Sequence, residues 1–388
     1  MDFVIDGNAY LNVAISVSRN IAFRDKTIGT QYYVEDILNE GEFILKDQIK
    51  VQFRNFCLNY FYSLIAPAGK RIGRVHLAFD SRSWRKDFIQ KYFDSGSSGD
   101  SSASPDKFVY KGNRKKDNKI YLFFDYFQNE IAPIIVRETG VNYYRIPGTE
   151  GDDIIAYLCE MLNTDVMVYT VDGDIAQLTY SSRKNVIVIY PKQQRKHKKI
   201  CVPMEFNPDF ADDEEDNFFS LNESHVAEST ITQTIDAFKS KDYVEYVIDP
   251  VADVFTKIFR GDKKDNIPKM DKMTPTKTKK LIEIISSEFG TKSIDLLDAL
   301  DETFINFVVK HISILNKVSE IDQLKDIRKH FLFNTRIIRL SSKLFPSVIQ
   351  DSLKANIKRS EFTKFSFKKF TNLKNNPSII WNRYTKEF

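Results

Sequence analysis

The first half of the chain alternates short apolar runs with longer amphipathic segments. The apolar runs are rich in β-branched and aromatic residues and predict buried strands at 3–6, 75–80, 141–145, 166–171 and 185–190. The longer segments place apolar residues at helical spacing and predict helices at 34–64, 118–137 and 150–162. This alternation predicts an α/β fold whose central sheet is mostly parallel and flanked by helices.

The second half of the chain has a helical pattern, which predicts helices at 251–259, 276–289, 294–318 and 321–333 and then a basic, aromatic and irregular end at 362–388. Residues 203–240 are acidic and lack a clear period, which predicts a partly disordered insertion without chemistry of its own. Residues 95–105 are rich in Ser and Gly and predict a flexible loop. We therefore expect an α/β core over residues 1–250 and a helical region with a basic tail over residues 251–388.

Length and composition limit the class of protein. With 388 residues, of which 42% are apolar, the chain can form one large domain or two modest ones. Its apolar runs are shorter than a membrane span and its start lacks a secretory signal pattern, so we expect no membrane partner and a cytoplasmic location. The three cysteines are scattered without metal-ligand spacing, which predicts reduced thiols. Nothing in the pattern demands an oligomer, and we expect a monomer.

Acidic residues lie at the ends of the apolar runs. Nine carboxylates share this placement: Asp6, Asp80, Glu150, Asp152, Asp153, Asp172, Asp174, Asp262 and Asp265. The ends of parallel strands meet at one edge of a sheet, where ligands bind. Crowded carboxylates need a cation, and Mg²⁺ prefers hard oxygen ligands beside phosphates. The pattern therefore predicts a metal site at this edge.

Each acidic cluster also has a purely structural interpretation. The spacing from Thr149 to Asp152 fits a helix capping box, and Asp172-Gly-Asp174 fits a turn. The block at 261–268, with its glycine and proline, could simply end a helix.

The charge of the chain is uneven, although the net value is only +4. Basic runs occur at 111–119, 195–199 and 263–264, and the region after residue 251 is rich in Lys and Arg. Basic surfaces around an acidic centre are typical of a protein that holds a polyanion by its phosphates. The alternative for each single run is an ordinary solvated surface.

Five short motifs carry a family resemblance. They are V-I-D-G-N around Asp6, A-F-D at Asp80, E-x-D-D at 150–153, D-x-D at 172–174, and G-D-x-x-D-N-I-P at 261–268. In this order, over residues 2–289, they resemble the 5′-nuclease family, which includes flap endonucleases and the nuclease domains of bacterial DNA polymerases. Residues 83–88, 257–266 and 387–388 are most similar to the ribonuclease H, a 5′-to-3′ exonuclease, of T-even phages. A phage-encoded chain would act in the cytoplasm of the host cell.

The resemblance implies a PIN-like nuclease core with two Mg²⁺ sites and with Mn²⁺ as a substitute for Mg²⁺. The first metal would be surrounded by Asp6, Asp80, Glu150, Asp152 and Asp172. The second would be surrounded by Asp174, Asp262 and Asp265, with Asp153 near both. Two such ions can activate a water and stabilise the leaving oxygen, which suits a site whose motifs contain no histidine.

The resemblance also implies a helical arch over about 82–119, through or under which the 5′ strand passes. Lys111 and Arg114 would contact the scissile phosphate. The further residues expected to bind nucleic acid are Arg85, Lys86, Tyr110, Lys115, Lys263, Lys264, Lys277, Lys279 and Lys280. The sequence departs from the family where the glycine-rich turn is missing after residue 268, which predicts a degenerate helix-hairpin-helix within a duplex-binding segment over about 261–290.

The function implied is a Mg²⁺-dependent 5′-to-3′ exonuclease and flap endonuclease. Its substrates would be RNA–DNA hybrids and flap or nicked duplex DNA, from which it removes RNA primers during lagging-strand replication. Replication proteins such as a single-stranded DNA-binding protein are candidate partners. The alternative is a structure-specific DNA-binding protein without cleavage activity. A phosphatase with an Asp nucleophile ranks below both, because Asn8 stands where that class has its second Asp.

Overall fold

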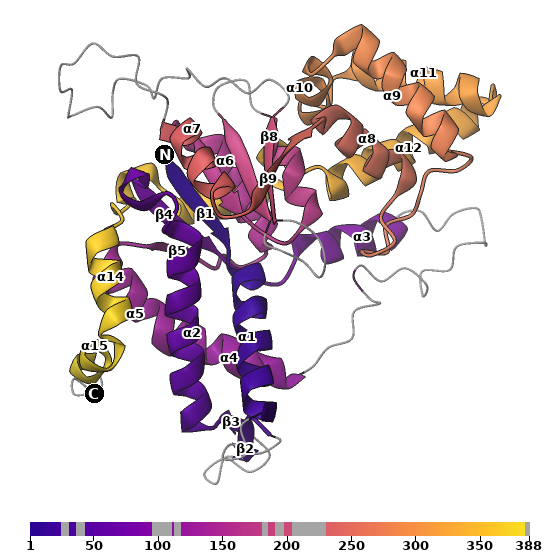
Figure 1. Cartoon of the computed structure of the whole chain (residues 1–388). Coiled ribbons are helices and arrows are strands. Elements are labelled where there is room, and N and C mark those ends of the chain that lie inside the picture. Colours follow the sequence, from indigo (N-terminus) through magenta and orange to yellow (C-terminus); the bar gives the residue numbers. More distant parts are fainter. Residues whose placement is uncertain are drawn as a thin grey trace, which may run out of the picture.

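The computed structural model describes residues 1–24, 31–35, 43–94, 111, 118–180, 185–190, 198–203 and 230–384. A seven-stranded sheet lies at its centre, in the order β5-β4-β1-β6-β7-β8-β9 (Figure 1). The strands are β1 (Asp2–Asp6), β4 (Arg74–Ala78), β5 (Asn142–Tyr144), β6 (Val166–Tyr169), β7 (Val186–Tyr190), β8 (Lys198–Pro203) and β9 (Tyr243–Ile248). Within this sheet, as far as the described residues form it, only the pairing of β7 with β8 is antiparallel. The predicted α/β fold with a mostly parallel sheet is confirmed.

The central strands are buried on both faces because helices cover both. Phe3 and Ile5 of β1 belong to one hydrophobic core, and Val4 between them belongs to a second core on the other face. This alternation follows from the two-residue repeat of a strand. It explains why these strands are continuous apolar runs in the sequence.

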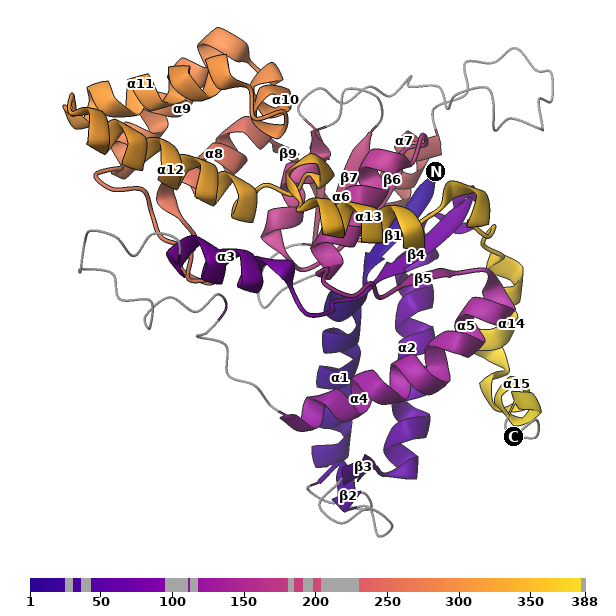
Figure 2. The same ribbon diagram turned by 180° about the vertical axis from the view of Figure 1, so that it is seen from behind.

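Helices of both the first half and the end of the chain cover the first core. They are α1 (Gly7–Arg24), α2 (Asp47–Ile65), α5 (Ala132–Thr139) and α14 (Phe367–Asn375). The second core lies under α6 (Gly151–Met161) and α13 (Ser347–Asn356), as the reverse view shows (Figure 2). The segment before α5 is a continuous helical stretch of a 3-10 turn (Asn118–Ile120), α4 (Tyr121–Tyr126) and a π-helical turn (Phe127–Ile131), as the helix prediction for 118–137 requires.

A third hydrophobic core holds the helical region beside the sheet. This region consists of α8 (Pro250–Arg260), α9 (Pro275–Phe289), α10 (Lys292–Asp298), α11 (Glu302–Asn316) and α12 (Ile321–Ile338). The helix predicted at 294–318 is interrupted, because Leu300 has a left-handed backbone (φ 49) and Asp301 caps α11 by accepting a hydrogen bond from the Phe304 N–H.

Three local predictions were wrong. The first part of the helix predicted at 34–64 is instead a two-stranded ribbon of β2 (Tyr33–Glu35) and β3 (Phe43–Leu45). The irregular end predicted at 362–388 forms α14 and α15 (Pro377–Tyr384), and α14 packs on α2 and α5. Strands β8 and β9 and helix α7 (Thr230–Lys239) were not predicted; the rest of the expected insertion and the Ser/Gly loop lie outside the described residues.

Two further expectations concern the described part of the chain. None of its helices is long and apolar enough to cross a membrane. Cys57, Cys159 and Cys201 are buried and form no disulfide, as predicted.

Candidate metal centre

Three of the predicted acids lie at the carboxyl ends of adjacent parallel strands. Asp6 ends β1, Asp80 follows β4 by two residues, and Asp172 follows β6 by three. The Asp6 carboxylate accepts hydrogen bonds from the Ala9 N–H (2.9 Å) and the Thr170 hydroxyl (2.7 Å). These bonds fix the Asp6 side chain between two strand ends.

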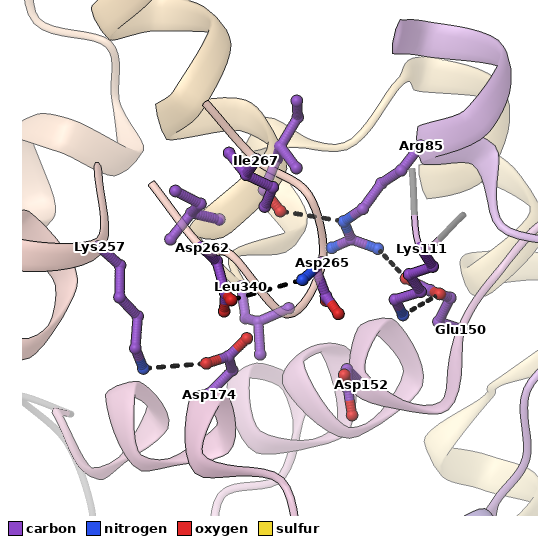
Figure 3. Close-up of a pocket in the computed structure, with 12 residues that line it drawn as sticks. Arg85, Lys111, Glu150, Asp152, Asp174, Lys257, Asp262, Asp265, Ile267 and Leu340 are labelled. Atoms are coloured by element: carbon purple, nitrogen blue, oxygen red, sulfur yellow. Dashed lines mark hydrogen bonds and ion pairs between the residues drawn. The ribbon is translucent and has the colours of Figure 1, made fainter. Parts of the chain in front are cut away.

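Helix α6 brings two further acids to the same edge. The Gly151 N–H at its start donates to Asp80 Oδ1 (2.7 Å). A Cβ atom on Gly151 would lie 3.2 Å from this oxygen, so glycine permits the close approach. Glu150 and Asp152 flank the glycine and line one pocket (Figure 3).

Asp152 lies at the centre of this group of carboxylates. Burial raises the pKa of Asp152 well above its usual range, and the nearby charges of Asp172, Asp6, Asp80 and Glu150 raise it further. Burial likewise raises the pKa of Asp6, to about 6, and that of Asp80. We call Asp6, Asp80 and Asp152 the inner acids. In the described part of the chain, no Lys or Arg side chain is paired with the inner acids.

Basic side chains are paired with the acids around this centre. Glu150 binds Arg85 (3.1 Å) and Lys111 (2.5 Å) through different carboxylate oxygens. Asp174 lies 3.0 Å from the Lys257 ammonium, and the Lys264 ammonium lies 3.6 Å from Asp172. Figure 3 shows the pairs of Arg85 and Lys111 with Glu150 and the pair of Lys257 with Asp174, with Asp152 apart from them. The basic residues paired with these acids are Arg85, Lys111, Lys257 and Lys264.

A tight turn after α8 presents Asp262 and Asp265 to the pocket. The backbone groups of Asp262 and Ile267 bond each other in both directions (3.1 and 2.7 Å). Gly261 has φ +64, and a Cβ there would lie 2.3 Å from the Ile267 carbonyl, so this position requires glycine. The Asp262 carboxylate accepts the Lys264 N–H (2.7 Å), which closes the turn. Residues 261–268 therefore follow the end of α8 and form a turn that is closed by its own hydrogen bonds.

Helix α12 holds this turn in place from the other side. The Asn334 side-chain amide donates to the carbonyls of Ile258 (2.8 Å) and Pro268 (3.0 Å), on either side of the turn. The Lys111 N–H donates to the Asp265 carbonyl (3.2 Å). Asp265 is itself buried. The helical region and residue 111 are thus both tied to the acidic turn.

Asp153 differs from the other acids, because its carboxylate is fully buried and its partners are structural. It accepts hydrogen bonds from Trp84 Nε1 (3.1 Å) and the Glu150 N–H (3.0 Å), and it pairs with Arg85 at 2.7 Å. The bond to Glu150 is part of a capping box that spans residues 150–153, one residue later than the predicted Thr149 to Asp152. Asp153 therefore supports the helix start, whereas the sequence placed it near both metals.

Arg85 is also placed differently from the sequence expectation. Its side chain is only 2% exposed and lies between Glu150, Asp153 and the Ile337 carbonyl, to which its Nε donates (3.0 Å). The guanidinium is buried and faces protein partners in this arrangement, and its predicted contact with nucleic acid stays a prediction. Arg85 joins the start of α6 to the end of α12.

The remaining predicted basic residues fall into three groups. Lys277 is half-buried and donates to the Asn316 side chain (2.9 Å), and Lys111 is half-buried at the pocket. The exposed residues are Lys86, Lys263, Lys264, Lys279 and Lys280. The residues that lie outside the described part of the chain are Tyr110, Arg114 and Lys115.

One residue of the site was missed by the sequence reasoning. Lys257 lines the pocket with Asp152, Asp174 and Asp262, but only its place in the 257–266 block was noted. The available signal was the spacing of Asp253 and Lys257, which puts both on one face of α8.

The donor set is chemically suited to a divalent cation but is not assembled as a ligand shell. Among the described residues, no three Asp, Glu, His or Cys side chains are placed as a group that could hold a metal ion. All candidate donors are carboxylate oxygens, which hard cations such as Mg²⁺ prefer. The charge at the inner acids gives a reason for such an ion to bind, and binding would require the side chains to converge.

Comparisons with known proteins give distant structural similarity. No protein-family model and no curated protein matches the chain. A phage T5 protein co-crystallized with metal ions aligns at 14% identity and a TM-score of 0.44, covering 96% of this chain and 98% of the other. A bacteriophage T5 flap endonuclease in complex with DNA and metal ions aligns at 14% identity and a TM-score of 0.42, covering 96% and 99%. The catalytic core of Rad2 with a DNA substrate aligns at 14% identity and a TM-score of 0.29, covering 95% and 81%.

Proposed function

We propose that this chain is a divalent-metal-dependent 5′ nuclease that hydrolyses phosphodiester bonds. One observation carries the proposal: carboxylates from separate segments meet at the carboxyl edge of a parallel sheet, around Asp152, and the inner acids have no basic partner among the described residues. A protein that only binds nucleic acid would gain nothing from negative charge facing phosphates. A nuclease needs this charge to hold its metal ions.

Different residues of the chain would bind the metal ions, the scissile phosphate and the duplex. The inner acids would hold one ion, and Asp174, Asp262 and Asp265 (the outer acids) would face the second position. Bound Mg²⁺ or Mn²⁺ would supply an activated water and neutralise charge on the phosphate. The Lys111 ammonium, which lines the pocket and pairs with Glu150, would bind and orient that phosphate. The exposed lysines of the 261–268 turn and α9 would grip the duplex backbone.

The finer assignment rests on the order of the five motifs. It comprises 5′-to-3′ exonuclease and flap endonuclease activity on RNA–DNA hybrids and on flap or nicked duplex DNA, with primer removal in lagging-strand replication as the role. The second candidate function is structure-specific DNA binding without cleavage. It is favoured by the ion pairs of Glu150 and Asp174, because carboxylates that are paired with Arg or Lys side chains do not need a metal ion to balance their charge.

A cleavage assay separates the two functions. A 5′-labelled RNA–DNA hybrid and a 5′-flap duplex are incubated with the protein in Mg²⁺ or in EDTA. Short products in Mg²⁺, absent in EDTA, are expected for the nuclease. Binding of both substrates without products in Mg²⁺ and in Mn²⁺ would establish the second candidate instead.

Replacing Lys111 by alanine is expected to slow cleavage about 100-fold, because a positioned donor at the phosphate is lost. Mn²⁺ binding, followed by calorimetry, should persist, since Lys111 is not a metal ligand. Lys354, exposed on α13, provides the control: its alanine variant should cleave within about threefold of the wild-type rate. Unchanged turnover in the Lys111 variant would refute the phosphate role.

A further inference from the structure

Lys257 is an ammonium group inside the acidic pocket. Its Nζ atom lies 3.0 Å from Asp174 Oδ1 (Figure 3). The same atom lies 3.0 Å from Asp253 Oδ2, and the side chain is 21% exposed. Lys257 and Asp253 belong to α8, whereas Asp174 lies in the 3-10 helix after β6. The lysine thus bridges two segments that face the pocket.

The Lys257 ammonium has two acidic partners, Asp174 and Asp253, each at 3.0 Å. It therefore places a positive charge beside the outer acids. An ammonium at 3.0 Å from Asp174 occupies an oxygen that a divalent ion would otherwise bind.

The two groups of acids differ in this respect. Among the described residues, the inner acids have no Lys or Arg partner within ion-pair distance, whereas Asp174 of the outer acids has Lys257. A divalent ion that reaches the inner acids displaces no ion pair of theirs. An ion that reaches Asp174 must compete with a cation that the chain itself supplies.

The pair with Asp253 gives Lys257 a second partner. Asp253 accepts from the lysine at 3.0 Å on the same face of α8, and it does not line the pocket. When Lys257 releases Asp174, it remains paired with Asp253. Displacement therefore costs one contact and does not leave a buried charge without a partner.

We infer that Lys257 is a built-in competitor for the second metal position. Divalent ions then load in a fixed order: the first at the inner acids, and the second at the outer acids once Lys257 has released Asp174 and kept its pair with Asp253. The inference rests on the proposed function, because it assumes that the carboxylates bind metal. It adds an order of loading and a residue that sets the affinity of the second step.

Mn²⁺ titration calorimetry on the wild-type protein and on Lys257→Gln tests the inference without any cleavage. Glutamine keeps the length of a polar side chain but removes the charge. We expect the weaker of two binding steps to tighten about tenfold or more, since an opposing charge close to the ion is removed, and the tighter step to change less than about threefold. The matched control is Lys263→Gln, which removes an exposed charge from the adjacent turn. It should change either step less than about threefold.

Each other outcome overturns the inference. A second step that is unchanged or weaker in Lys257→Gln would mean that the lysine does not compete for Asp174. If Lys263→Gln tightened the weaker Mn²⁺ binding step by the same factor, the change would come from the net charge of the protein and not from the position of Lys257. Two metal steps in the wild type with no change in Lys257→Gln would refute the inference and leave the proposed function standing. Absence of any Mn²⁺ binding in the wild type would refute both.

A measurement on the wild-type protein does not depend on how the variant folds. Amine labelling followed by mass spectrometry reports the accessibility of each lysine. Labelling of Lys257 should increase when Mn²⁺ is raised to fill both positions, whereas labelling of Lys263 should stay constant. Constant labelling of Lys257 across the Mn²⁺ range would overturn the displacement step.

Discussion

Replacing Asp152 by asparagine is expected to abolish cleavage and, in the absence of metal, to stabilise the fold. Asp152 is the acid on which the charges of Asp172, Asp6, Asp80 and Glu150 converge. Loss of a direct metal ligand removes several kcal/mol of transition-state stabilisation, which lowers the cleavage rate by a factor of about 10³ or more. Binding of a duplex should persist, because asparagine adds no negative charge near the phosphates.

The stability change has the opposite sign from that of most substitutions. A carboxylate in a crowded, buried acidic group is destabilising, and each pKa unit of such an upward shift corresponds to about 1.4 kcal/mol. The neutral amide removes the repulsion, so the free energy of unfolding in EDTA should rise. Mg²⁺ should stabilise the wild type, because an ion that binds only the folded state shifts the unfolding equilibrium toward that state. It should have little effect on the variant, because the variant has lost a proposed metal ligand.

Denaturant unfolding in EDTA and in Mg²⁺, together with the cleavage assay, checks both effects. Asp351→Asn is the matched control, because Asp351 is exposed on α13. Its stability and rate should stay close to the wild-type values. A cleavage rate retained in Asp152→Asn would disprove the metal assignment. Lower stability in EDTA would mean that Asp152 makes a stabilising contact and that the centre is not charged as proposed.

The sheet was predictable where its strands are buried on both faces. Strands β1, β4, β6 and β7 are nearly continuous apolar runs, because helices cover both sides. Strand β8 was missed because it begins with two lysines. Strand β9 was missed because it lies at the edge of the sheet and exposes Val244, Tyr246 and Val247. Edge strands carry a weaker periodic signal, since water covers part of each face.

The convergence of the acids was predictable in the same way, from their positions after strand ends. The individual role of each acid was not. Asp152 and Asp153 are neighbours in sequence, but one helical residue turns the side chain by about 100°, so one faces the pocket and the other the protein interior. Contacts between distant segments could not be predicted from the sequence either. Examples are the ion pairs of Lys257 with Asp174 and of Arg85 with Glu150. They depend on packing that a linear pattern does not contain.

Replacing Arg85 by leucine is expected to destabilise the fold by about 3–5 kcal/mol, because one partner of a buried ion pair is removed while the other remains charged. Asp153 is 0% exposed and Arg85 is 2% exposed, so water cannot compensate the lost charge. The same substitution breaks the bond to the Ile337 carbonyl and so loosens α12 from the start of α6. Denaturant unfolding in EDTA measures the loss.

Two further variants identify the cause of this destabilisation. Arg82→Leu is the matched control, since Arg82 is 76% exposed and pairs with the exposed Asp87; its stability should change by about 0.5 kcal/mol or less. Adding Asp153→Asn to Arg85→Leu should recover about 1 kcal/mol or more, because the unpaired charge is removed. If Arg85→Leu instead unfolds like the wild type but binds nucleic acid weakly, the arginine contacts the substrate, and its burial between Glu150 and Asp153 does not describe its working state.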